Sequence, residues 1–194
     1  MLSTIPLAEE SLPDGWVWVD PAGRGVRRVT ETGLELTPVA GAGVLRNVLT
    51  PRMVRPFEGD FDLETTLDLT EGRERAGGLL VYQDDRTLLR LMAGMHLDGE
   101  ISLTVKSREH GLAVVGRGLL PVDEPRLRLA RRGNCFTAWC GDGDSWYRCG
   151  RAEIPLDHRV EAGIVVETTQ RHFCLNRCAV APVEFSEIRL FSSA

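Results

Sequence analysis

The chain has 194 residues, of which 43% are hydrophobic, and this suits one domain with a sizeable buried core. Its formal net charge of −5 disfavours nucleic acid or an anionic membrane surface as the main partner. No apolar run is long enough to span a membrane, and residues 1–15 lack the basic and apolar regions of a secretory signal. We therefore expect a cytoplasmic protein.

The expected elements are short strands between turn residues. Residues 16–19 form the first strand, and its two tryptophans fall on one face because strand side chains alternate. Pro51 and Pro56 mark strand ends or a sheet edge in an extended stretch. In chain order, the strands expected in this half are 16–19, 26–30, 34–37, an extended 44–57, 61–69, 76–82 and 87–95. The apolar strand 76–82 is expected to be central and covered on both faces.

The second half continues the same pattern. Asp98-Gly99, Gly133-Asn134 and Asp142-Gly143 are hairpin signals between alternating runs. Trp146 is expected to fasten the last of these hairpins onto the core. The remaining strands are expected within 101–106, 112–120, 126–129, 135–140, 147–154, 160–167, 174–180 and 184–191. About a dozen strands without an amphipathic helix predict an all-β sandwich or barrel.

The cysteines indicate reduced thiols. There are five of them, an odd number in a chain without a visible signal peptide: Cys135, Cys140, Cys149, Cys174 and Cys178. Their C-x4-C and C-x3-C spacings lack the paired C-x2-C pattern of structural zinc sites. We predict neither a metal nor a cofactor.

Five phrases occur in a characteristic order: the two-tryptophan start, GDFDLET (59–65), AGGLLVYQDDRTLLRL (76–91), RLRLARRGNCFTAWCGDGDSW (126–146) and VEFSEIRLF (183–191). Together they resemble the concanavalin A-like lectin/glucanase superfamily, with DUF1349-type domains and the β-sandwich of family 43 glycosidases as the nearest branch. The resemblance covers nearly the whole chain, so residues 1–194 are expected to form one domain. It implies an antiparallel two-sheet jelly roll with ligands on the concave face or its rim.

The chain departs from the superfamily at two points. Glu184 and Glu187 stand where related domains often carry aspartate, which removes the basis for a family-like calcium site. The glucanase pattern E-x-D-x-x-E is absent. The resemblance therefore implies a fold and a binding face, and it does not imply glucanase chemistry.

Alternation along the strands also predicts a ligand-binding face. Where leucines face the core, their neighbours in sequence face outward. Six outward residues are predicted to share a groove on the concave sheet: Glu64, Tyr82, Arg90, Lys106, Arg128 and Trp139. Arginine holds carboxylates or phosphates, and a tryptophan face stacks on a sugar ring. The alternative is that these are ordinary solvent-facing residues on two different sheets.

Three functions are consistent with this reading. The first is non-catalytic binding of a carbohydrate or another polar or anionic small molecule. The second is a small-molecule lyase, isomerase or cyclase, with Glu64, Tyr82 or a histidine such as His96 or His172 as the acid or base. The third is a structural or interaction domain, with a homodimer formed through an open sheet edge.

Overall fold

The computed structural model describes residues 2–4, 15–38, 50–70, 75–94, 99–168 and 181–192. These residues form strands and connections, and none of them is in a helix, so this part of the chain holds no helix that could cross a membrane. The strands are β1 (Leu2–Thr4), β2 (Val17–Val19), β3 (Val26–Val29), β4 (Leu34–Thr37), β5 (Arg52–Glu58), β6 (Phe61–Asp68), β7 (Arg75–Asp84), β8 (Thr87–Ala93), β9 (Glu100–Ser107), β10 (Gly111–Leu119), β11 (Arg126–Arg132), β12 (Cys135–Asp142), β13 (Ser145–Glu153), β14 (Arg159–Thr168) and β15 (Val183–Ser192).

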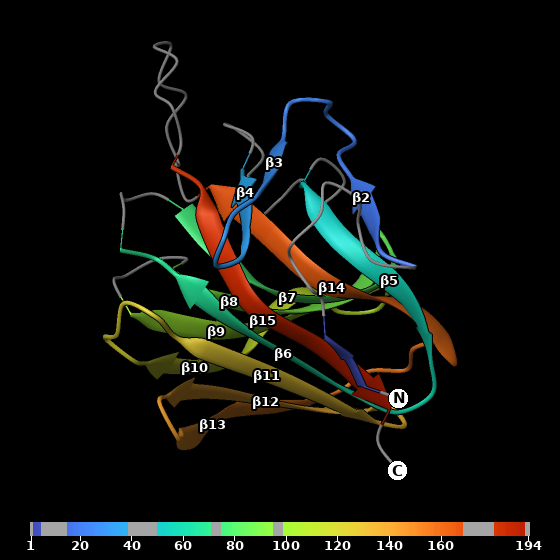
Figure 1. Ribbon diagram of the computed structural model, residues 1–194. Helices are drawn as coiled ribbons and strands as arrows, with labels where there is room; N and C mark the ends of the chain where they lie inside the picture. Colours follow the sequence, from blue (N-terminus) through green and yellow to red (C-terminus); the bar gives the residue numbers. More distant parts are fainter. Residues whose placement is uncertain are drawn as a thin grey trace.

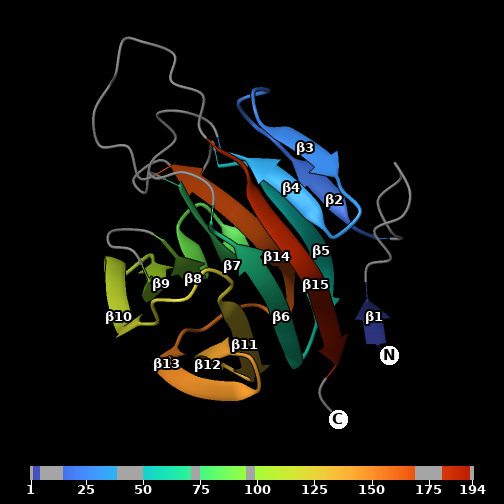
Figure 2. The same ribbon diagram turned by 60° about the vertical axis from the view of Figure 1, so that its left-hand side comes forward.

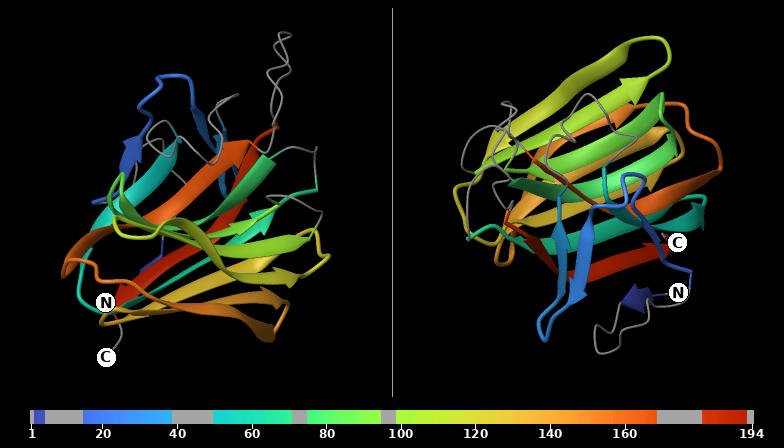
Figure 3. Two further views of the ribbon diagram at one scale, coloured as in Figure 1. Left: turned by 180° about the vertical axis from the view of Figure 1, so that it is seen from behind. Right: turned by 90° about the horizontal axis from the view of Figure 1, so that it is seen from above.

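Two antiparallel sheets stack on each other (Figure 1). Sheet A has the order β13-β12-β11-β6-β15-β4-β3, and β1 also pairs with β15. Sheet B has the order β10-β9-β8-β7-β14-β5-β2, and from behind β14 is seen between β5 and β7 (Figure 3). The predicted all-β, antiparallel, two-sheet sandwich is confirmed. The edge strands β10 and β13 lie beside each other, with the backbone of Gly116 close to that of Cys149 (Figure 2).

The space between the sheets is filled by the inward half of each alternating strand. Phe61, Leu63 and Leu67 of β6 are fully buried there, and they face sheet B residues such as Leu79 and Leu91. Because each buried leucine or phenylalanine side chain contributes about 1.5–3 kcal/mol, this core supplies the main driving force for folding. Trp16 and Trp18 both pack on it, as their common parity predicts.

The middle strands of sheet B are buried on their outer face as well. A second apolar cluster lies there, formed by Val54, Ala76, Leu80, Leu88, Met92 and Val165. The prediction that residues 76–82 form a central strand covered on both faces is confirmed by β7, which pairs with β8 and β14. Pro56 lies within β5 rather than at its end. This is compatible with the sheet because β2 pairs with β5 only over residues 52–54.

The hairpin of β12 and β13 turns at Gly143, whose φ of 55° suits glycine. The prediction that Trp146 fastens this hairpin onto the core is wrong. Trp146 pairs with Gly141, an outward position of β12, so its ring lies on the outer face of sheet A. There the guanidinium carbon of Arg126 is 4.6 Å from the ring centroid. The predicted strand 174–180 lies outside the described residues.

Candidate functional site

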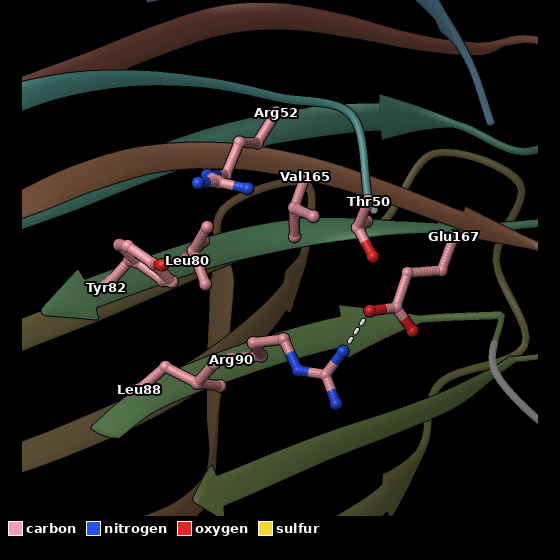
Figure 4. Close-up of a pocket in the computed structure, with 8 residues that line it drawn as sticks. All are labelled: Thr50, Arg52, Leu80, Tyr82, Leu88, Arg90, Val165 and Glu167. Atoms are coloured by element: carbon pink, nitrogen blue, oxygen red, sulfur yellow. Dashed lines mark hydrogen bonds and ion pairs between the residues drawn. The ribbon is translucent and has the colours of Figure 1, made fainter. Parts of the chain in front are cut away.

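A pocket lies on the outer face of sheet B, over the middle strands β5, β7, β8 and β14 (Figure 4). It contains about 230 Å³ of empty space, including the space at its open mouth. Three apolar side chains and five polar ones line it: Leu80, Leu88, Val165, Thr50, Arg52, Tyr82, Arg90 and Glu167.

Strand alternation explains why these residues meet. Leu79, Leu89 and Ile164 point into the core, so the next residues, Leu80, Arg90 and Val165, point outward. Register then brings the outward residues side by side, because Leu80 pairs with Arg90 and Val165 pairs with Arg52. Residues from four strands, separated widely in sequence, therefore converge.

Two outward positions beneath the pocket are glycines, so no side chain extends into the pocket from them. Gly78 lies opposite Val165 in β14, and Gly163 lies opposite Leu80 in β7. A Cβ at Gly78 would overlap the carbonyl of Leu91, and one at Gly163 would overlap the carbonyl of Met53. Neither position has room for a side chain, so the neighbouring strands approach closely beneath the pocket.

Arg90 and Glu167 form an ion pair inside the pocket (Figure 4). Nη1 of Arg90 donates to Oε1 of Glu167, and the two side chains are only 3% and 1% exposed. Burial raises the pKa of Glu167, and the positive charge and hydrogen bond of Arg90 act against that rise. The two side chains therefore meet in a poorly solvated place.

Arg52 and Tyr82 form a second contact across the pocket. The guanidinium carbon of Arg52 is 4.5 Å from the centroid of the Tyr82 ring, which is the geometry of a cation–π interaction. The Tyr82 hydroxyl donates to Oδ1 of Asp85 at 2.8 Å. Burial, followed by the hydrogen bond to Asp85, raises the pKa of Tyr82 to about 12. Tyr82 is therefore a neutral phenol at physiological pH.

Five buried polar atoms in the pocket have no hydrogen-bond partner among the described residues. They are Thr50 Oγ1, Arg52 Nε, Arg52 Nη1, Arg90 Nε and Glu167 Oε2. Buried polar groups in folded proteins are nearly always paired, because an unpaired one costs about 1–3 kcal/mol. Their gathering in one pocket gives it donors and acceptors that a polar ligand can satisfy.

The six predicted ligand-binding residues do not share one face. Tyr82 and Arg90 line the pocket, and Lys106 lies nearby on the same outer face because it pairs with Leu88. Glu64, Arg128 and Trp139 belong to β6, β11 and β12 of sheet A. The prediction of one common groove is wrong, because alternation gives the face of a strand but not its sheet, and the two outer faces of a sandwich point in opposite directions.

The three residues on sheet A form a cluster of their own. Register aligns Arg128 with both Glu64 and Trp139. Nε of Arg128 is 3.3 Å from a Glu64 carboxylate oxygen, and Nη2 is 3.0 Å from one of Asp62. The Arg128 guanidinium carbon is also 5.4 Å from the Trp139 ring centroid. These groups satisfy each other on a partly exposed sheet face.

Sequence reasoning missed Thr50, Arg52 and Glu167. A usable signal exists for two of them, because Glu167 is a charged residue directly after the apolar run 162–166, and Arg52 precedes the inward Met53. His96, His172, Cys174 and Cys178 lie outside the described residues. Within the described ranges, no group of three or more histidine, cysteine, aspartate or glutamate side chains could hold a metal ion.

Solved structures share this fold. The GH43 protein BlXynB from Bacillus licheniformis aligns with a TM-score of 0.76 and 16% identity over 98% of this chain. A functionally unknown protein from Saccharomyces cerevisiae gives 0.69 and 15%, covering 93% of this chain and 97% of that protein. The carbohydrate-binding module CBM66 from Bacillus subtilis gives 0.61 and 14%, covering 92% and 96%.

The chain thus has the β-sandwich fold of GH43 and CBM66 domains. It spans only 39% of the length of BlXynB, so the similarity concerns one part of that protein. No protein-family model matches the sequence. No curated protein matches it either.

Proposed function

We propose that this protein binds a carbohydrate or a similar polar small molecule in the sheet B pocket, without chemical conversion. One observation carries the proposal: five buried polar atoms without partners among the described residues line a single pocket. The apolar side chains of Leu80, Leu88 and Val165 lie between them. Alternating polar and apolar contacts suit a sugar, whose ring presents both hydroxyls and C–H groups.

The lining residues favour holding a ligand over proton transfer. Glu167 is paired with Arg90, and Tyr82 is a neutral phenol bound to Asp85. Arg52 and Arg90 are permanently protonated. The fold shared with CBM66 and GH43 domains supports carbohydrate binding by analogy. We also propose that the chain belongs to the DUF1349-type branch, forms a single domain and is located in the cytoplasm.

A binding screen tests this function. Monosaccharides and disaccharides are titrated into the protein by calorimetry, and the bound sugar is recovered and examined by NMR. We expect at least one sugar to bind and to be recovered unchanged. Val165→Phe fills the pocket and should abolish binding, whereas Val26→Phe, at an exposed position on β3 of sheet A, should not.

Thr50→Val provides a milder variant, because it removes one unpartnered hydroxyl with little change in volume. It should weaken binding about tenfold, in line with the loss of one hydrogen bond. Conversion of the sugar would contradict the non-catalytic part of the proposal. Binding that Val165→Phe leaves intact would move the site elsewhere.

A second candidate function is association through the edge of sheet B. The edge strand β10 carries four exposed apolar side chains, Leu112, Val114, Val115 and Leu119. A group of exposed apolar side chains on one strand can mark a protein–protein contact. If it forms a homodimer, light scattering will show twice the monomer mass, and Val114→Lys will return the protein to a monomer.

A further inference from the structure

The residues that line the sheet B pocket include two arginines and one carboxylate. We propose that its ligand is a single sugar or sugar-like ring bearing one carboxylate, such as a uronate. This inference rests on the proposed binding function and gives the ligand its chemical class. Arg52 and Arg90 each contribute one positive charge, and Glu167 contributes at most one negative charge. A monoanion would therefore balance the charges of the lining residues, and the carboxylates of Asp85 and Glu161 lie around Tyr82 outside that lining.

Arg52 is the group that most needs an anion. Its Nε and Nη1 are buried and have no acceptor among the described residues, and the residue is 7% exposed. Tyr82, which lies against its guanidinium, supplies only the face of a neutral ring. A buried cation is costly unless an acceptor compensates it, and a carboxylate is the acceptor that best matches a guanidinium.

The other unpartnered atoms suit hydroxyl groups. Oε2 of Glu167 can only accept when the carboxylate is ionised, Arg90 Nε can only donate, and Thr50 Oγ1 can do both. A sugar hydroxyl both donates and accepts, so it can pair with each of them. These atoms lie on the far side of Leu80 and Val165 from Tyr82 (Figure 4). A ring placed over those two apolar residues could direct its carboxylate to Arg52 and its hydroxyls to Arg90 and Glu167.

Charge narrows the class further. A phosphate ester near pH 7 carries up to two negative charges. The Glu167 carboxylate, when ionised, would repel the second of these charges. The carboxylate of a sugar acid fits this balance better.

Matched pairs of sugars test the proposal. Glucuronate, galacturonate and mannuronate are titrated by calorimetry beside glucose, galactose and mannose. We expect at least one acid to bind about 10- to 100-fold more tightly than its neutral parent, as one charge-assisted contact would give. Equal or tighter binding of every neutral parent would overturn the inference and leave the proposed function standing. Absence of binding in both series would overturn both.

Variants at Arg52 assign the preference to this residue. Arg52→Met should weaken binding of the acid by a larger factor than binding of the neutral parent, so that the preference for the acid is lost. Arg28→Met removes the same charge at an exposed position of sheet A and should leave both affinities unchanged. Circular dichroism confirms folding. Should Arg52→Met not fold, Arg52→Lys replaces it, with an expected severalfold loss for the acid alone. An equal loss for acid and neutral sugar would contradict the assignment.

Discussion

Arg90 on β8 and Glu167 on β14 form a buried ion pair across the intervening strand β7. On β7, Leu80 pairs with Arg90 and Ala76 pairs with Glu167. The outward position between them is Gly78, which has no side chain to stand in the way. Gly78 of the central strand β7 thus allows the two charged groups to meet. The same glycine adds no side chain to the floor of the pocket.

The first prediction concerns the stability of this pair. Glu167→Ala leaves Arg90 buried without its partner and should lower the free energy of unfolding by about 3–5 kcal/mol. The double variant Arg90→Met/Glu167→Leu removes both charges and should be more stable than Glu167→Ala. Urea unfolding measures both. The exposed pair of Arg159 and Glu58 is the control, because Glu58→Ala should cost less than about 1 kcal/mol. Equal costs for the two alanine variants would contradict a special role for the buried pair.

The second prediction concerns pH. Because burial raises the pKa of Glu167, the folded protein binds this proton more tightly than the unfolded chain. The resulting stabilisation is complete below the unfolded value of about 4.3 and is lost as pH rises through the folded pKa. The free energy of unfolding of the wild type, taken relative to Glu167→Gln, should therefore fall as pH rises above about 4.3. A relative stability that rises with pH would show instead that the charge of Arg90 outweighs burial.

The sequence was sufficient to predict the sandwich but not the site. Alternation in β6 and β11 is clear because one face of each strand packs in the core, so their inward residues could be assigned. The pocket depends instead on which strands are neighbours. Arg52 and Val165 come together through pairing across more than half of the chain, and no local pattern encodes that pairing.

Sequence reasoning also did not reveal that polar side chains are buried on the outer face of sheet B. Arg90 was predicted to point outward, yet it is 2% exposed, because the middle of the outer face of sheet B is itself buried. Outward parity normally indicates solvent, and Arg128 on sheet A meets that expectation in part. Arg90 and Arg128 differ in how their strands are covered in the tertiary structure. That difference makes the Arg90 site buried and leaves the Arg128 cluster at the surface.

The third prediction concerns the glycine beneath the pocket. Gly163→Ala would place a Cβ against the carbonyl of Met53 on the adjacent strand, so β5 and β14 would have to separate. We expect the variant to lower the free energy of unfolding by about 1–3 kcal/mol or more, as overpacking does, and to weaken ligand binding. Gly118→Ala on the edge strand β10 meets no atom within 4 Å and should be neutral or slightly stabilising. Urea unfolding of both variants checks the contrast, and equal effects would contradict it.

The fourth prediction concerns Arg131, an arginine at an inward position near the end of β11. It is 3% exposed, and its guanidinium donates to the carbonyls of Gly133, Leu156, Asp157 and His158 at 3.0, 3.3, 2.7 and 3.4 Å. Burial lowers the pKa of Arg131, and the negative charges of Asp60 and Asp157 act against that fall. The side chain therefore attaches the β13–β14 connection to the end of sheet A.

Arg131→Met should lower the free energy of unfolding by about 3 kcal/mol, because hydrogen bonds to a charged group contribute about 1.5–3 kcal/mol each and do not add fully. Arg131→Lys keeps the charge but cannot reach all four carbonyls, so it should recover only part of the loss. Arg28→Met, at an exposed site, serves as the control and should change stability by less than about 0.5 kcal/mol. Hydrogen exchange gives a local readout, because amides around Ile154 should lose protection before those of the central strand β7. Uniform loss across the sandwich would mean that Arg131 stabilises the fold as a whole and does not fasten this connection.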